Sequence, residues 1–212
     1  MAIQINGNGT ITGISVGGLP DGIVDTDMIA ANAVATAKIA DSAVTSAKAS
    51  GLGGLTMVDQ WRMYQDHGEA NNHVLAYWEQ NDSQFSNIGG SMTNNGYPNG
   101  VFTFPSTGIY KIDFFGSFKR AANQNLNAIN LIIQGTTNDG SDGFPNLARG
   151  TAQMASAGDN QLTHVTCSAI FDVTNVSTHK VRVYLNAATH VRTEASSDHN
   201  KTAITFLKLG ET

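Results

Sequence analysis

The six histidines and the single cysteine are the residues that could bind a metal ion or act as a nucleophile. No two histidines have the His-X-X-X-His or His-Glu-X-X-His spacing, and Cys167 has no second ligand at the distance in sequence that zinc sites use. A lone cysteine cannot form an intrachain disulfide, and the setting of Cys167 among strand-forming residues predicts a buried small thiol. We therefore expect no metal and no cofactor.

The densest cluster of polar side chains is the segment 190–199, which contains His190, Arg192, Glu194 and Asp198. The segment falls between two predicted strands. Loops carry many functional residues, but an ordinary solvated loop has the same polar composition. We expect a solvated loop here rather than a functional site.

Cleavage of a polysaccharide would need two carboxylates about 5 to 10 Å apart on either side of a bound sugar. Asp139, Asp142 and Glu194 are the candidates, and each falls in a loop with no visible rigid support. Gly-X-Ser-X-Gly and phosphate-loop patterns are absent from the sequence. We expect no catalytic residues and no enzyme activity.

Sugar binding without catalysis requires less, namely an aromatic face and a few Asn or Asp side chains. The segments 134–146 and 81–99 have this composition. Ordinary turns use the same residues, so surface loops without a ligand remain the alternative. The sequence assigns no receptor-binding residue.

From Thr56 onward, runs of alternating and β-branched residues are separated by Asn, Gly, Asp and Ser. Only 14% of the residues are charged, against about 25% in typical domains. Short alternating segments without a helical pattern predict an antiparallel sandwich or jelly roll. The expected strands are residues 57–63, 74–79, 101–104, 108–118, 126–134, 162–173, 180–186 and 202–208.

Two segments of this region resemble a known family of head domains. They are residues 101–112 (VFTFPSTGIYKI) and the final strand 202–209 (TAITFLKL). The segments resemble the trimeric jelly-roll heads shared by complement collagen-like proteins and tumour necrosis factor relatives. Pro105 is expected to set a corner and Gly108 to allow the turn, while the Tyr110 hydroxyl needs a partner. The chain departs from secreted animal members because it has neither a Gly-X-Y segment nor a signal peptide.

The first 55 residues have a different composition, since every aromatic residue lies between Trp61 and Phe206. Aromatic side chains supply the largest increments of buried area, so this part cannot form a compact core of its own. It must be elongated or gain its buried surface from other chains. We place the boundary in the glycine-rich segment 50–54.

The first part repeats with a period of ten residues, as seen when 23–32, 33–42 and 43–50 are aligned. Short fixed periods are typical of arrays in which each unit is buried only by neighbours or copies of itself. We expect short helical turns separated by extended links at Asp41-Ser42 and its counterparts, repeated around an axis that several chains share. The axis candidates are Val24, Ile29, Val34, Ile39 and Val44.

Two alternatives exist for this repeat. A single straight helix would need one apolar face, but apolar residues every five positions advance by about 140° per step and are scattered around the circumference. A flexible linker rich in Ala, Gly and Thr also has this composition. At the start of the chain, Asn-Gly pairs between alternating runs in residues 3–12 predict a hairpin, which is a candidate attachment element.

The segments 22–34 (GIVDTDMIAANAV) and 36–48 (TAKIADSAVTSAK) are similar to repeats in fibre and appendage proteins of tailed bacteriophages, especially cyanophage-like ones. The resemblance implies a homotrimer with an N-terminal virion anchor, a repetitive stalk and a β-rich distal knob. The expected architecture is therefore all-β, with an antiparallel jelly-roll head after an elongated stalk. We assign residues 1–20 to virion attachment, 21–55 to the stalk and glycine-rich linker, and 56–212 to the head.

The expected function is that of a structural virion protein, a trimeric tail fibre or spike whose head attaches to a host-surface glycan. Its partners would be its own copies and, through the N-terminal region, other virion proteins. The net charge of −5 argues against nucleic acid, and no membrane insertion is expected. We expect a soluble product that is assembled into virions in the host cytoplasm. The alternatives are a capsid decoration protein, a polysaccharide depolymerase and a cellular trimeric binding module.

Overall fold

The computed structural model describes residues 4–5, 11–12, 34–35, 38–40, 43–44, 55–68, 72–82, 85–120, 126–154, 161–187 and 190–212. The chain divides into two units, Met1–Gly54 and Leu55–Thr212. No helix in the described part is long and apolar enough to cross a membrane. The second unit, called the head below, contains two antiparallel β-sheets.

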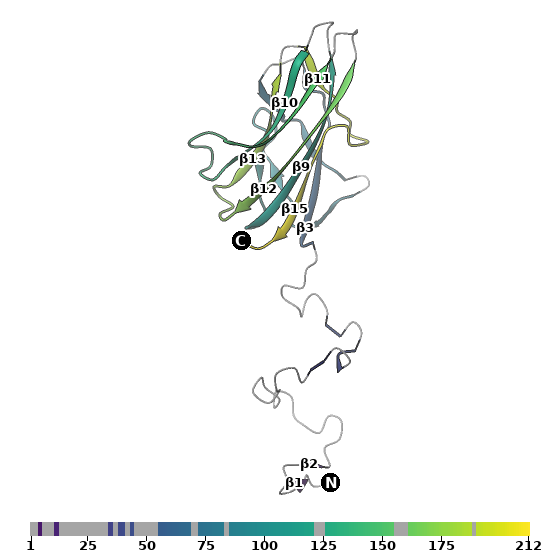
Figure 1. The fold of residues 1–212 in the computed structure, drawn as a ribbon, viewed down its shortest axis with the longest axis vertical. Helices are drawn as coiled ribbons and strands as arrows, with labels where there is room; N and C mark the ends of the chain where they lie inside the picture. Colours follow the sequence, from purple (N-terminus) through teal and green to yellow (C-terminus); the bar gives the residue numbers. More distant parts are fainter. Residues whose placement is uncertain are drawn as a thin grey trace. The chain divides into compact units, whose positions relative to one another are not determined.

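The first sheet of the head has seven strands, with the order β12-β9-β15-β3-β5 and with β14 on β9 and β6 on β3. Figure 1 labels its neighbouring strands β12, β9, β15 and β3. The last strand, β15, pairs with both the first long strand, β3, and the long strand β9. The strands are β3 (Met57–Met63), β5 (Trp78–Gln80), β6 (Asn87–Gly89), β9 (Gly108–Arg120), β12 (Leu162–Val173), β14 (Val191–Thr193) and β15 (Ala203–Gly210).

The second sheet has six strands, with the order β11-β10-β13-β8-β7 and with β4 paired to β13. Its strands are β4 (His73–Val74), β7 (Thr93–Asn94), β8 (Phe102–Thr103), β10 (Leu126–Thr136), β11 (Asn146–Met154) and β13 (Lys180–Ala187). Every pairing in both sheets is antiparallel. The prediction of an antiparallel all-β head is therefore confirmed.

The core lies between the sheets because alternate side chains of each strand point inward. Tyr110, Ile112 and Phe114 of β9 are buried, as are Val181 and Val183 of β13. Their neighbours on the same strands are more exposed. Residues of this size supply most of the burial that stabilises a sandwich.

The corner before β9 confirms the roles expected of Gly108 and Tyr110. Gly108 has φ +143°, and a Cβ at this position would collide with the Lys208 side chain and the Gly210 carbonyl. Tyr110 is fully buried, and its hydroxyl donates to the Ser106 carbonyl oxygen at 3.0 Å. The tyrosine thus closes the turn that the glycine permits.

Seven of the eight expected strands match the structure to within two residues at each end. The prediction of one strand at 74–79 is wrong, since β4 belongs to the six-stranded sheet and β5 to the seven-stranded sheet. Leu75 and Ala76, between them, are buried. A continuous apolar run here marks a crossing between sheets, which periodicity alone does not reveal.

Strands β6, β7, β11 and β14 were not expected. The segment 190–199 is accordingly not wholly a solvated loop, because Val191 and Thr193 of β14 are fully buried. β14 is only three residues long, too short to show an alternation. Its pairing with the end of β9 is a long-range contact that local sequence does not encode.

In the first unit, β1 (Gln4–Ile5) pairs with β2 (Ile11–Thr12) in antiparallel register. This pairing confirms the expected hairpin. In the repeat, the Lys38 amide donates to the Ala35 carbonyl at 2.8 Å and the Ala43 amide to the Ala40 carbonyl at 3.0 Å, as in single turns. The links expected at Asp41-Ser42 lie outside the described residues.

The five residues predicted to lie on the shared axis include some that the structure describes and some that it does not. Val24 and Ile29 lie outside the described residues. Val34, Ile39 and Val44 are 52%, 42% and 47% exposed in the single chain. Their burial between copies of the chain stays a prediction.

Candidate functional sites on the two faces of the head

The outward face of the seven-stranded sheet exposes apolar side chains. Ile170 of β12 is 67% exposed and Phe115 of β9 is 37% exposed. The strand register places Ile170 beside Lys111, and Lys111 beside Leu207. Leu162 and Leu209 are exposed at the ends of β12 and β15. We call this surface the apolar face. Exposed apolar groupings of this kind mark interaction surfaces in soluble domains.

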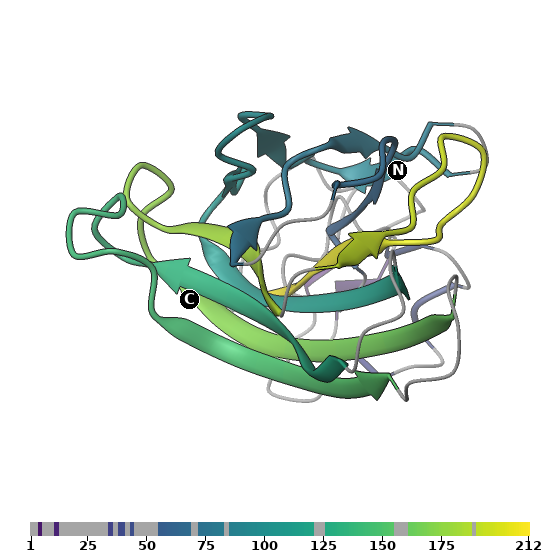
Figure 2. The ribbon, with the colours of Figure 1, turned by 90° about the horizontal axis from the view of Figure 1, so that it is seen from above.

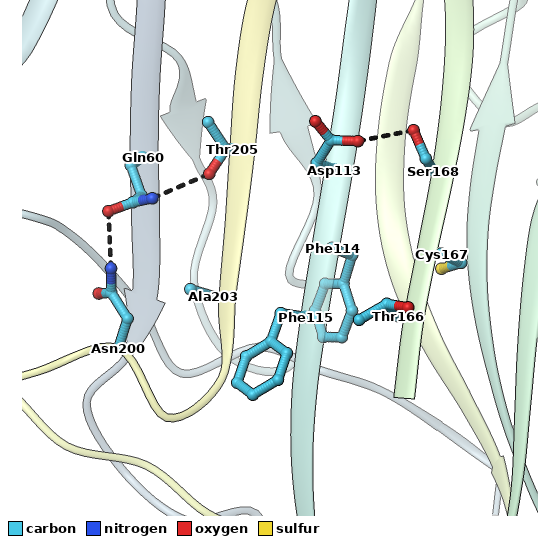
Figure 3. Close-up of a pocket in the computed structure, with 10 residues that line it drawn as sticks. All are labelled: Gln60, Asp113, Phe114, Phe115, Thr166, Cys167, Ser168, Asn200, Ala203 and Thr205. Atoms are coloured by element: carbon cyan, nitrogen blue, oxygen red, sulfur yellow. Dashed lines mark hydrogen bonds between the residues drawn. The ribbon is translucent and has the colours of Figure 1, made fainter. Parts of the chain in front are cut away.

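A shallow groove of about 630 Å³ lies on the apolar face around Phe115, Thr166 and Thr205 (Figure 3). Its polar groups bond to each other. The Ser168 hydroxyl donates to Asp113 Oδ1 at 2.6 Å. Gln60 donates to the Thr205 hydroxyl at 2.9 Å. These groups are already satisfied, so the groove can contact another protein surface without leaving them unpaired.

Cys167 lines the same groove and is half-buried. Burial raises the pKa of its thiol to about 11, despite hydrogen bonds from the backbone of Ile133 and Gly150 that act in the opposite direction. A thiol with such a pKa is almost wholly protonated at neutral pH and is a poor nucleophile. The predicted strand position is confirmed, although the side chain is less buried than expected.

The two segments singled out for their sugar-binding composition meet at one pocket on the six-stranded sheet. The pocket has a volume of about 290 Å³. Segment 81–99 contributes Asn95, Pro98 and Asn99, and segment 134–146 contributes Asp139 and Phe144. Strand β13 contributes Lys180 and Arg182, and Val74 and Val101 complete the lining. We call this the loop pocket.

The β10–β11 loop, which forms one wall of the loop pocket, is fixed by hydrogen bonds. The Asp139 amide donates to the Thr178 carbonyl at 2.8 Å, which joins this loop to the β12–β13 loop; Figure 2 shows the two loops side by side. The Gly140 amide donates to the Thr136 hydroxyl at 3.1 Å. Asn138 donates to the Asp142 carboxylate. The wall is therefore held in place before any ligand arrives.

The opposite wall is the turn 95–100. The Asn95 side chain accepts a hydrogen bond from the Val101 amide at 2.8 Å, and the Gly100 amide donates to the Gly96 carbonyl at 2.8 Å. Gly100 has φ +59°, and a Cβ there would collide with the Leu75 carbonyl. The turn thus requires glycine at this position.

An aromatic cluster adjoins this turn. Tyr97 stacks on Tyr77 with ring centroids 5.1 Å apart and an interplanar angle of 1°, and Tyr97 is 62% exposed. The centroid of the His67 ring lies 5.0 Å from that of the Tyr77 ring and 4.0 Å from that of the His73 ring. Burial lowers the pKa of His67, so its neutral form is favoured.

The carboxylates considered for catalysis have different surroundings in the structure. Glu194 forms ion pairs with Lys201 at 3.2 Å and Lys119 at 3.9 Å. Asp142 accepts from Asn138, and Asp139 lines the loop pocket. In the described residues, no group of three or more His, Cys, Asp or Glu side chains could hold a metal ion.

Sequence reasoning missed Lys180, Arg182 and Phe115. The alternation in β13 already indicates that Lys180 and Arg182 point outward when Val181 and Val183 point inward. It does not indicate which loops lie opposite them.

No family model matches the chain, and no curated protein matches its sequence. Solved structures do resemble it. The Eiger TNF structure from S. frugiperda has a TM-score of 0.55 at 12% identity and covers 75% of this chain and 96% of its own. Murine APRIL at pH 5.0 has a TM-score of 0.52 at 14% identity, and the match covers 72% of this chain and 98% of the APRIL chain. The head therefore has a TNF-like β-sandwich fold.

Proposed function

We propose that the chain is a homotrimeric structural protein of a tailed bacteriophage virion, a tail fibre or spike whose head attaches to the host surface. In this proposal residues 1–20 bind the virion, residues 21–55 form the stalk and residues 56–212 form the head. The virion role rests on the similarity of segments 22–34 and 36–48 to phage appendage repeats.

The observation that carries the self-association is the apolar face. Ile170, Phe115 and Leu209 are exposed on one sheet, and the polar groups in the groove among them are bonded to each other. Association of copies through this surface would remove the apolar side chains from water at about 25 cal/mol per Å². Closed symmetric assembly is the usual outcome for identical chains.

The exposed valines and isoleucine of the repeat fit the same assembly. Val34, Ile39 and Val44 have little burial within their own chain and would gain it from copies. Three equivalent heads on one shaft would convert weak contacts with a host surface into useful avidity.

Native mass spectrometry of the full chain, followed by localisation of the protein in purified particles, tests the proposal. We expect a trimer, a few of which are present in each virion at the tail. A monomer would contradict the homotrimer, and hundreds of chains on the capsid would assign the protein to capsid decoration instead.

A further inference from the structure

The loop pocket contains two cations whose bonding partners are neutral. Arg182 Nε donates to the Gln134 side-chain oxygen at 2.8 Å, and its guanidinium lies 4.1 Å from the centroid of the Phe144 ring. Lys180 Nζ donates to the Thr103 hydroxyl at 3.3 Å and the Val176 carbonyl at 3.2 Å. Within the described residues, neither side chain forms an ion pair.

Both cations are half-buried. Burial lowers the pKa of Arg182, and the nearby Tyr184 partly offsets this effect. An arginine stays charged at neutral pH even so. Because the partners that bond to these cations are neutral, an anionic ligand would add a charge-assisted hydrogen bond. The positive character is local, since the whole chain has a net charge of −5.

The other polar groups of the pocket suit a ligand with hydroxyls as well as a negative charge. Asp139, which is exposed, adds a carboxylate to the lining that can accept from hydroxyls and would repel a multiply charged anion such as phosphate more than a singly charged one. Asn95 and Asn99 add side-chain amides. Because the Asn95 oxygen already accepts from Val101, its NH₂ group is the part that can donate to a ligand.

Tyr97 precedes Pro98 and Asn99, which line the pocket, and adds an exposed aromatic ring to the same turn. One face of its ring contacts Tyr77, while 62% of the residue is exposed. An exposed, well-supported aromatic ring can bury the C–H face of a sugar ring at little conformational cost. The volume of about 290 Å³ is at the lower end for ligand sites, which suits one small unit of a ligand.

We propose that the loop pocket binds a carboxylated sugar residue. Arg182 and Lys180 hold the sugar carboxylate, Asp139 and the Asn95 and Asn99 amides bond to its hydroxyls, and Tyr97 stacks on a neighbouring ring. The walls are fixed by internal hydrogen bonds, so little ordering is required on binding. The inference rests on the attachment role proposed above and names the ligand class for it.

Ligand-observed NMR with the full chain tests this assignment. The probes are glucuronate, galacturonate and N-acetylneuraminate, each compared with its methyl ester, which keeps the ring and loses the charge. We expect at least one acid to bind about tenfold or more tightly than its ester, the loss typical of a charge-assisted hydrogen bond.

Variants locate the binding. Arg182→Gln should weaken the bound acid about tenfold or more, and Tyr97→Ala should weaken a dimer of that sugar more than the single sugar. Arg149→Gln is the matched control, since Arg149 is an exposed arginine of β11 in the same sheet and lies outside the pocket lining. It should leave binding unchanged.

Three results would overturn the assignment: no binding of any acid, equal binding of acids and esters, or equal losses in Arg182→Gln and Arg149→Gln. Displacement of the acid by sodium acetate at the same concentration would show an anion site without sugar recognition and would also overturn it. Native mass measured on the same sample separates this inference from the assembly, because a trimer that binds no acid contradicts only the pocket.

Discussion

The two outward faces of the head differ in the side chains they expose although both belong to antiparallel sheets of one sandwich. The apolar face exposes Ile170, Phe115 and Leu209 and includes an ion pair between Lys111 and Asp113. The six-stranded sheet instead carries a chain of polar bonds. On it Asn130 donates to Asn186 at 3.0 Å, Asn186 donates to Asn72 at 2.7 Å, and Thr151 donates to Asn130 at 2.9 Å.

The difference separates two tasks. Water-exposed apolar side chains lose little and gain much when a second protein surface covers them. A polar face with bonded amides gains nothing from such a cover, but it can support a site for a hydrophilic ligand. This difference is the basis for proposing association between copies through the apolar face and ligand binding at the face that carries the loop pocket.

Ile170→Asp is expected to have the largest effect. Ile170 is exposed in the single chain, so the head should still fold, but an unpaired charge buried in an interface costs about 3 kcal/mol or more. We expect dissociation on size-exclusion chromatography with light scattering. Ser177→Asp adds the same charge to an exposed turn and should leave the oligomer intact. An unchanged oligomer in Ile170→Asp would remove the apolar face from the interface.

Val34→Asp tests whether the exposed apolar residues of the first unit are also buried between copies of the chain. A charge at a junction between chains should weaken association by about tenfold or more, less than Ile170→Asp if the head supplies most of the contact. Ala40→Asp, at an exposed position outside the axis candidates, is the control. Native mass as a function of concentration measures both. Equal behaviour of the two variants would favour a flexible linker.

The sequence predicts the long strands of both faces because their alternation is local. In the first half of β9 and in β13, large apolar residues alternate with others, and the apolar residues Tyr110, Ile112, Phe114, Val181, Val183 and Leu185 are found buried. β11 gave no such signal, since its burial is shallow and it contains Ala148, Gly150 and Ala152. A Cβ at position 150 would collide with the Thr166 carbonyl, so this residue is set by a strand from the other sheet.

The sites were predictable only in part, because the sequence shows local patterns but not contacts between distant segments. Composition alone identified segments 81–99 and 134–146. Their meeting with Arg182 depends on topology, because the three elements are far apart in the chain and are joined by sheet pairing. The apolar face is likewise a product of the register of β12, β9 and β15.

Asn186→Ala tests the polar face and should have a smaller effect. It removes a donor to Asn72 and an acceptor for Asn130, a loss of about 0.5 to 1.5 kcal/mol for each net hydrogen bond. We expect a melting temperature a few degrees lower and the same native mass. Gln153→Ala removes an exposed amide of β11 and should change neither. A change in native mass for Asn186→Ala would show that the six-stranded sheet also takes part in association, contrary to the proposal.

Asp113→Asn is expected to have the smallest effect and tests how far water reaches the apolar face. Burial raises the pKa of Asp113. Hydrogen bonds from Lys111 and Ser168, together with the charge of Lys111, lower the pKa by more than burial raises it, so it lies below its ordinary value of 3.8. The carboxylate therefore stabilises the fold above that ordinary value, and this stability is lost as the pH falls through the lowered pKa. Thermal unfolding between pH 6 and pH 3 should show a steeper loss in the wild type than in Asp113→Asn.

The size of that loss should depend on association. The Lys111 and Asp113 side chains are 44% and 40% exposed in the single chain, so the pair contributes no more than about 1 kcal/mol when the chain is dilute and dissociated. In the proposed assembly the pair would be shielded from water, and removing one partner should cost more. Unfolding measured above and below the association concentration gives the two values. Equal losses at both concentrations would mean that Lys111 and Asp113 lie outside the interface, which would then have to be centred on the Leu162 or Leu209 end of the face.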